Sequence, residues 1–395
     1  MLIVQTSDWH AGRLWKGIDR LDELEAVLAH LGDFIERERV DLLLMTGDVF
    51  DTRGPSAAAE RAVFGFFRRV GNAGTRTCVI AGNHDDPVRL DAWGTLAELA
   101  DVTTVARPRR ADRGGVIEHE TRSGQRAVVA VVPFAKTSDL VSAAEMAASD
   151  THAHQRYAEG MRGIIGHLTT RFRPDAVNLL MAHTHLDGAV LARSERRVHL
   201  GKEWSATAQV LPSTAHYVGL GHIHKPQRIE AAPSPAYYAG SALQLDFGEI
   251  GEEKSFVVIA AEPGQPARIE RVPYAGGKSL HDVRKTLTEL DREAEQLCAL
   301  GWLRVTVPLE APDIDLNRKV RQLLGNAVVS VDYELPEQPD RTPTRAGPGL
   351  TRLTCSASTI RRTTALPPNR RLPRRSPNYC TTPRSSRNET SQARP

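Results

Sequence analysis

The strongest constraint on the fold is the stretch LLLMTGDVFD at residues 42–51, in which an apolar run stops abruptly at a glycine and two carboxylates. Four consecutive large apolar residues predict a strand buried on both faces, as in a parallel sheet covered by helices. Gly47 permits a tight turn, which places Asp48 at the carboxyl end of that strand. Open α/β sheets bind ligands at these ends, although Gly-Asp is also an ordinary turn dipeptide.

Apolar strands alternate with amphipathic helices along the first 275 residues, which indicates an α/β fold. The predicted helices cover residues 21–35, 57–70 and 151–172. The predicted strands cover residues 2–5, 42–45, 77–81, 128–132, 176–182 and 216–220, and strands at 237–239, 255–261 and 268–273 are expected to complete a second sheet.

Five of these strands end in polar side chains suited to metal binding. The sets are Asp8 with His10, Asp48 with Asp51, Asn83 with His84, His183 with His185, and His222 with His224. Side chains two residues apart in an extended segment share a face, so a pair can hold one ion. A single such ending is more often a plain turn or an exposed histidine. Five of them at the strand ends of one sheet system predict a common cavity.

The donor types restrict the ion. Carboxylate, imidazole and amide donors without thiolate suit manganese, iron or zinc. The four cysteines are scattered and form no CxxC pair, so neither a disulfide framework nor a structural zinc site is expected. Asp48 is central and could bridge two ions roughly 3.5 to 4 Å apart, the arrangement used for in-line displacement at phosphorus. The alternative is one ion with spare histidines, but the donors exceed what one ion needs.

The motifs DxH, GDVFD, GNHD, AHTH and GHIH occur in an order that resembles the calcineurin-like metallophosphoesterase superfamily. Within it, DWHAG, GDVFDT, AGNHD and YYAGSALQLDFGE are similar to the SbcD family of nuclease subunits, over about residues 1–335. The resemblance implies an α/β fold: a two-sheet β-sandwich flanked by helices, with a small α+β capping domain.

The resemblance also assigns roles to the residues of the predicted cavity. It implies two divalent ions, taken to be Mn²⁺, and a catalytic histidine, His84, that is not a ligand. Asp51 and Asp85 are given only outer roles, with Asp85 expected to orient His84, and His185 has either such a role or is merely exposed. One ion would be held by Asp8, His10, Asp48 and His224, and the other by Asp48, Asn83, His183 and His222.

The implied function is hydrolysis of DNA phosphodiester bonds, as an exonuclease and endonuclease in DNA repair, recombination and replication. The implied partners are DNA, an SbcC-type ATPase subunit and a second copy of the nuclease subunit. Two other functions stay open. A small-molecule phosphodiesterase would share every metal ligand, and a DNA-tethering scaffold would carry a silent metal site.

The chain is expected to contain three segments: a nuclease domain at 1–275, a capping domain at 279–336 and a disordered tail at 337–395. The capping domain should contain a helix at 280–297, a strand at 302–309, a helix at 316–324 and a strand at 328–335. A hydrophobic content of 41% supports a sizeable core. No membrane-length apolar run or signal-peptide start is found, so a cytoplasmic location is expected.

The tail has an unusual composition. Residues 341–395 contain twelve Arg, no Lys and one acid, a net charge of +11 that leaves −8 for residues 1–340. The tail is either a natural basic arm or the product of an altered reading frame. Prolines interrupt its few apolar residues, so no amphipathic face can be drawn for docking on an ATPase subunit. That docking is therefore expected to be impaired.

Overall fold

The computed structural model describes residues 1–121, 123–135, 150–192, 194–195 and 205–336. All of them belong to one compact unit, Met1–Glu337. The predicted tail at 337–395 lies outside the described residues. Among the helices that are described, none combines the length and the apolar character needed to cross a membrane.

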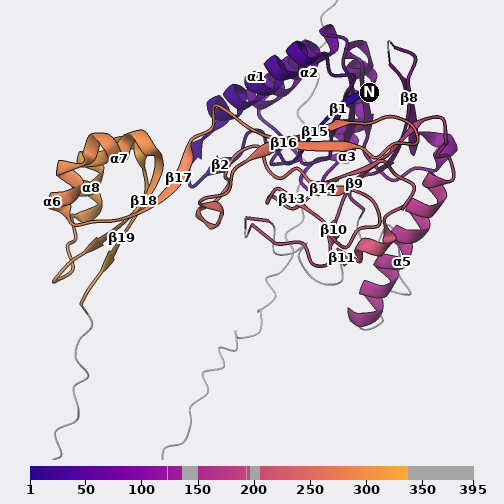
Figure 1. Cartoon of the computed structure of the whole chain (residues 1–395). Helices are drawn as coiled ribbons and strands as arrows, with labels where there is room; N and C mark the ends of the chain where they lie inside the picture. The colour runs from indigo at the N-terminus through magenta and orange to yellow at the C-terminus, as the bar shows by residue number, and fades with distance from the viewer. Residues whose placement is uncertain (122, 136–149, 193, 196–204, 337–395) are drawn as a thin grey trace, which may run out of the picture. The chain divides into compact units, whose positions relative to one another are not determined.

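The first six-stranded sheet has the strand order β16-β15-β1-β4-β5-β6. Figure 1 labels three of its strands, β1, β15 and β16. Four of its strands run parallel: β1 (Leu2–Thr6), β4 (Leu42–Met45), β5 (Arg76–Ile80) and β6 (Val102–Val105). Two antiparallel strands extend the sheet beyond β1: β15 (Ser255–Ala260) and β16 (Arg268–Pro273). The carboxyl ends of β1, β4 and β5 therefore meet at one edge.

The second six-stranded sheet has the order β13-β14-β12-β9-β8-β7. Its parallel strands are β8 (Arg126–Val132), β9 (Val177–His183), β12 (Tyr217–Gly221) and β14 (Ala236–Tyr238). The outer strands β7 (Val116–Glu120) and β13 (Gln227–Arg228) run antiparallel to their neighbours.

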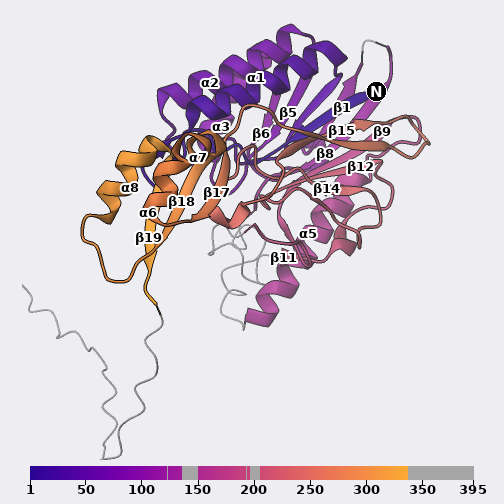
Figure 2. The ribbon, with the colours of Figure 1, turned by 60° about the vertical axis from the view of Figure 1, so that its left-hand side comes forward.

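The two sheets pack face to face, and helices cover their outer faces (Figure 2). Side chains alternate between the two faces of β4, which explains why this strand is wholly apolar. Leu42 and Leu44 contact the second sheet, whereas Leu43 and Met45 contact helices. The helices are α1 (Leu21–Glu38), α2 (Ala57–Asn72) and α3 (Pro87–Ala97) over the first sheet and α5 (Asp150–Thr169) over the second. The predicted two-sheet sandwich flanked by helices is confirmed.

One prediction about the sheets is wrong. Strands β15 and β16 were expected to complete the second sheet, but β15 pairs with β1, with Ile3 opposite Ile259. Its consecutive residues Phe256 and Val257 are buried on opposite faces, against the helices and against the second sheet respectively. A strand that is apolar on both faces fits the interior of the first sheet, and strand periodicity alone does not identify its neighbour.

The C-terminal part holds a three-stranded parallel sheet in the order β17-β18-β19. Its elements are β17 (Ser279–Arg284), α6 (Leu287–Arg292), α7 (Ala294–Leu300), β18 (Gly301–Pro308), α8 (Leu316–Leu324) and β19 (Val328–Glu334). They enclose a core of their own. Its status as a separate capping domain at 279–336 stays a prediction.

The predicted helix at 280–297 is wrong in this region. Its first part is the strand β17, in which Leu280 and Val283 are buried at a spacing that mimics a helical period. The helix begins only after Thr286. The Thr286 hydroxyl accepts a hydrogen bond from Glu289 N, and Thr286 N donates one to the Glu289 carboxylate. This capping box sets the true helix start.

Short elements complete the description. They are β2 (Leu14–Trp15) paired with β3 (Ile18–Asp19), β10 (His185–Leu186) paired with β11 (Ser205–Ala206), and the 3₁₀ turns η1 (Glu98–Ala100), η2 (Ala111–Arg113), η5 (Ala208–Val210), η6 (Phe247–Glu249) and η7 (Gly325–Ala327).

Candidate metal centre

The predicted ligands come together where the carboxyl ends of five parallel strands from both sheets meet. Strands β1, β4 and β5 of the first sheet and β9 and β12 of the second contribute them. Six of the side chains are buried and Asn83 is half-buried; the buried six are Asp8, His10, Asp48, His183, His222 and His224. The seven positions are spread from residue 8 to residue 224, so only the folded protein assembles them.

Asp48 lies between histidines from both sheets. Its Oδ2 is 3.7 Å from His10 Nε2 and 3.6 Å from His183 Nε2. Its Oδ1 accepts a hydrogen bond of 2.8 Å from His84 N. A carboxylate in this position can reach an ion on either side, as expected of a bridging ligand.

Two groups of donors surround Asp48. On one side, Asp8, His10 and His224 bring ligand atoms within 4.8 Å of one another, and His10 Nε2 lies 3.1 Å from His224 Nε2. On the other side, Asn83 Oδ1 lies 3.0 Å from His183 Nε2 and 2.8 Å from His222 Nδ1. These groups coincide with the two ligand sets implied by the sequence, but the assignment of each residue to one ion stays a prediction.

Two further groups of donors overlap with these two sets. Asp8, Asp48 and His183 also form a group of suitable size, as do His10, Asp48 and His84. His84 thus lies as close to His10 and Asp48 as a ligand would, and its catalytic role stays a prediction.

The backbone at the ligands is strained. In the described part of the chain seven non-glycine residues have positive φ, and four of them are predicted ligands: Asp8 at 49°, His10 at 48°, Asp48 at 51° and His222 at 100°. This left-handed region is unfavourable for residues with a side chain and is concentrated at functional sites. The surrounding fold therefore holds these residues in an orientation that local preferences oppose.

Glycine is required where β5 ends beside β4. A Cβ atom on Gly82 would lie 2.1 Å from Asp48 Oδ1 and 2.3 Å from Asp48 N. No side chain fits at such distances, so Gly82 lets the two strand ends approach closely enough for Asn83 and Asp48 to share the centre.

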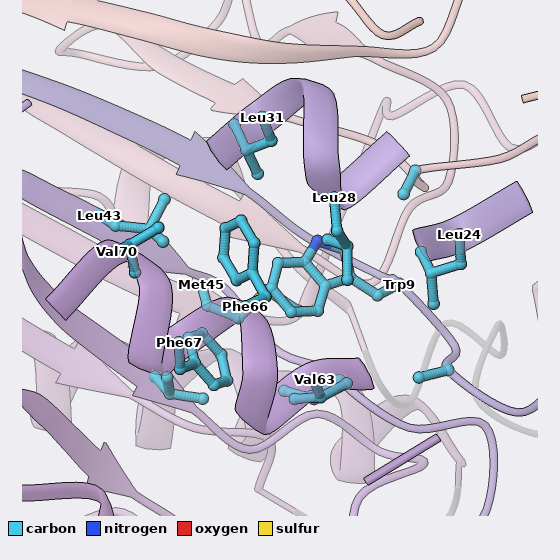
Figure 3. Close-up of a cluster of buried hydrophobic side chains, with 14 of the residues drawn as sticks. Trp9, Leu24, Leu28, Leu31, Leu43, Met45, Val63, Phe66, Phe67 and Val70 are labelled. Carbon is cyan, nitrogen blue, oxygen red and sulfur yellow. The ribbon is translucent and has the colours of Figure 1, made fainter. Parts of the chain in front are cut away.

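Trp9 anchors the loop between two of the ligands. It stands between Asp8 and His10 in sequence, and its side chain is buried in the core beneath α1 and α2 (Figure 3). The ring packs edge-on against Phe66 and stacks on Phe67, with centroids 5.3 and 5.5 Å away. Its Nε1 donates a 2.6 Å hydrogen bond to Thr6 Oγ1. Packing of Trp9 thus fixes the ligands on either side.

The electrostatics of the site favour a bound cation. Burial raises the pKa of Asp8 from its ordinary 3.8 to about 6. Burial, reinforced by the neighbouring His84 and His224, lowers the pKa of His10 well below its usual value. A neutral imidazole offers a lone pair to a metal ion, and a buried carboxylate is unfavourable unless a cation lies beside it. Together these groups form the donor set of a divalent ion of the manganese, iron or zinc type. The residues therefore fit the implied metals.

The residues given outer roles have clear contacts. His84 Nδ1 donates a 2.8 Å hydrogen bond to the backbone oxygen of Asp51, whose carboxylate also lies 3.2 Å from His10 Nδ1. Asp85 accepts hydrogen bonds from the backbone N–H groups of Gly82 and Phe50, and burial raises its pKa. The contacts seen for Asp85 thus fix the loops that carry the ligands. His185 is half-buried with its ring centroid 6.3 Å from that of His222, and burial lowers its pKa.

Sequence reasoning missed a group of residues behind His224. Ser194 Oγ lies 2.5 Å from His224 Nδ1 and donates a short hydrogen bond to Glu249. Glu249 is fully buried and forms a 2.7 Å ion pair with Lys254. Burial opposes its charge, but the His224 ring and the Lys254 ammonium prevail and lower the pKa of Glu249 to about 2. The only sequence signal was Glu249 as the last residue of the motif YYAGSALQLDFGE.

Comparison with known proteins agrees with this geometry. Residues 1–226 match the family model described as calcineurin-like phosphoesterase. The chain is 34% identical over 282 residues to the SbcD subunit of the SbcCD nuclease of Bacillus subtilis, covering 71% of each chain. Identity to the SbcD protein of Rhodobacter capsulatus is 30%, covering 74% of this chain and 76% of the relative. Identity to the SbcD protein of Escherichia coli K12 is 26%, covering 84% of this chain and 84% of the relative. The chain therefore belongs to the calcineurin-like phosphoesterase family and is a homologue of the SbcD proteins of SbcCD nucleases.

Proposed function

We propose that this protein is a manganese-dependent DNA nuclease, active as exonuclease and endonuclease in an SbcCD-type complex for DNA repair, recombination and replication. The observation that carries the proposal is the convergence of two donor groups on Asp48, with His84 beside them. The names of the relatives, each the SbcD component of an SbcCD nuclease, support DNA as the substrate. Such a protein would work in the cytoplasm.

The proposed reaction is hydrolysis of a phosphodiester. Two divalent ions, when bound, would neutralise charge on the phosphoryl oxygens and lower the pKa of a water molecule. Asp48 would hold both ions, since its Oδ2 lies close to a histidine of each sheet, His10 and His183. The carbonyl of Asp51 can only accept, so a His84 proton stays on Nδ1. The imidazolium form of His84 would carry a second proton on Nε2, which it would give to the leaving oxygen.

The test combines substrates and variants. Wild-type protein is incubated with Mn²⁺, Mg²⁺ or Zn²⁺ and with end-labelled duplex DNA, single-stranded circular DNA or a bis-nitrophenyl phosphodiester. Mn²⁺-dependent cutting of both DNAs is expected. Cleavage of the nitrophenyl ester alone would indicate a small-molecule phosphodiesterase, and no cleavage with two bound ions would indicate a silent scaffold.

Asp48→Asn should reduce DNA cleavage to background while the fold persists, because it removes charge from both ions at once. Asp101→Asn is a matched control, since Asp101 has a similar φ of 56° and lies on the surface after η1. Undiminished turnover in Asp48→Asn would refute the two-metal assignment.

A second copy of the chain would be one partner, and an exposed apolar surface supports this part of the proposal. Among the residues of α3 only Leu90 is buried, whereas Leu96 is 71% exposed and Leu99, in η1, is 86% exposed. With Phe64 and Trp93 these side chains line an apolar groove between α2 and α3. Apolar side chains left in water mark an association surface, and a two-fold contact of this groove with its copy would cover it. The SbcC-type ATPase subunit would be a separate partner.

A further inference from the structure

The side chain of His224 is held from behind by a buried chain of polar groups. His224 Nδ1 contacts Ser194 Oγ at 2.5 Å, and Ser194 Oγ donates to Glu249 Oε1. The other oxygen of Glu249 forms the 2.7 Å ion pair with Lys254 and accepts a 2.9 Å hydrogen bond from Leu245 N. The chain therefore runs from an imidazole at the metal centre to a buried ion pair.

Lys254 also holds the backbone of the same histidine. Its Nζ donates to the backbone oxygen of His224 at 2.9 Å and to Glu252 Oε2 at 2.9 Å, in addition to Glu249. An ammonium has three protons, so all three are used. Glu249 and Lys254 thus restrain both the ring and the main chain of His224.

The direction of the hydrogen bonds decides the tautomer of His224. Paired with the Lys254 ammonium, the Glu249 carboxylate acts only as an acceptor, so the single proton of the Ser194 hydroxyl points to it. The oxygen of Ser194 must then accept the proton of His224 Nδ1–H. This leaves the lone pair on Nε2, the atom that lies 3.1 Å from His10 Nε2 in the donor group with Asp8.

We propose that Glu249, acting through Ser194 and held by Lys254, is the positioning residue that keeps His224 in the tautomer and orientation required to bind a metal ion through Nε2. This inference rests on the metal centre of the proposed function. Partners of this kind orient a metal-binding histidine, and their loss typically lowers metal affinity by roughly 10- to 100-fold. Only the ion bound by His224 should be affected.

The first readout is metal binding, measured by titrating chelator-treated protein with Mn²⁺ and following free Mn²⁺ by electron paramagnetic resonance. Glu249→Gln and Ser194→Ala should weaken one of two bound ions by roughly 10- to 100-fold. Ser194→Thr, which keeps a hydroxyl, should restore the affinity. Glu252→Gln is the matched control, because Glu252 also hydrogen-bonds to Lys254 but its side chain makes no hydrogen bond to Ser194 or His224 within the described residues.

The second readout is the tautomer, observed by ¹⁵N correlation spectra of the histidine rings in the metal-free protein. His224 should carry its proton on Nδ1 in the wild type and in Glu252→Gln, and lose this preference in Ser194→Ala. Ser194→Ala leaves the Glu249–Lys254 pair intact, so it tests the proposal even if Glu249→Gln fails to fold.

Wild-type affinity for both ions in Ser194→Ala, or in folded Glu249→Gln, would overturn the proposal. An equal loss in Glu252→Gln would also overturn it, because the effect would then come from general disturbance around Lys254. Neither readout uses DNA cleavage. A wild-type protein that binds two ions but cuts no DNA would refute the proposed function and leave this inference standing.

Discussion

Replacing Asp8 with asparagine should stabilise the metal-free protein at neutral pH, although it removes a predicted ligand. Burial raises the pKa of Asp8 from its ordinary 3.8 to about 6. At a pH above both pKa values Asp8 is ionised in the folded and in the unfolded protein, and its negative charge is less stable when it is buried than when it is in water. A difference of one in pKa corresponds to about 1.4 kcal/mol, so ionised Asp8 lowers the free energy of unfolding by about 3 kcal/mol.

The sign and the pH window follow from the raised pKa. Below about pH 3.8 Asp8 is protonated in both states, and its full contribution to stability is present. That contribution is lost as the pH rises through about 6. Asp8→Asn should therefore gain up to about 3 kcal/mol near neutral pH and about half of that near pH 5. Asparagine keeps an oxygen able to accept the 3.1 Å hydrogen bond from His222 N.

The assay is urea unfolding followed by circular dichroism, in the presence of a chelator at both pH values. Asp51→Asn is the control for loss of a carboxylate, since the Asp51 side chain is 22% exposed and should give a much smaller gain. Added Mn²⁺ should then stabilise the wild type more than Asp8→Asn. If Asp8→Asn is no more stable than the wild type without metal, or its gain does not change with pH, the reasoning is refuted.

Three further predictions concern catalysis and assembly. His84→Ala should lower the turnover of DNA cleavage by roughly 10²- to 10⁴-fold without changing metal content; loss of an ion by elemental analysis would make His84 a ligand instead. Leu99→Glu should convert a dimer into a monomer in analytical ultracentrifugation, whereas Ile314→Glu, at a still more exposed apolar position after β18, should not. An unchanged dimer would place the interface elsewhere. The chain should bind its cognate SbcC-type ATPase subunit poorly and show little ATP-stimulated cutting of duplex ends, while it still cuts short or single-stranded DNA. A stable complex in size-exclusion chromatography that is abolished by truncation at Pro336 would contradict this reading of the tail.

Local patterns in the sequence were sufficient for most of the strands and for the donor types at their ends. The run from Leu42 to Met45 predicted a doubly buried parallel strand, because apolar residues on both faces leave no solvent-facing side. The DxH, GDVFD, GNHD, AHTH and GHIH motifs sit at the carboxyl ends of parallel strands, where a sheet of this topology must bring them to one edge. Hydrophobic periodicity and turn-forming residues depend only on neighbours a few positions away, so a single sequence is enough to recognise them.

Contacts between distant residues were decided only by the tertiary structure. The pairing of β15 with β1 depends on which edge is open, and β17 was mistaken for a helix because Leu280 and Val283 repeat at a helical spacing. The positive φ of His222 and the contacts of Glu249 with Ser194 and Lys254 leave no periodic trace in the sequence. Each depends on groups brought together from separate segments, where burial makes an ion pair or a strained backbone tolerable only because the whole fold compensates for it.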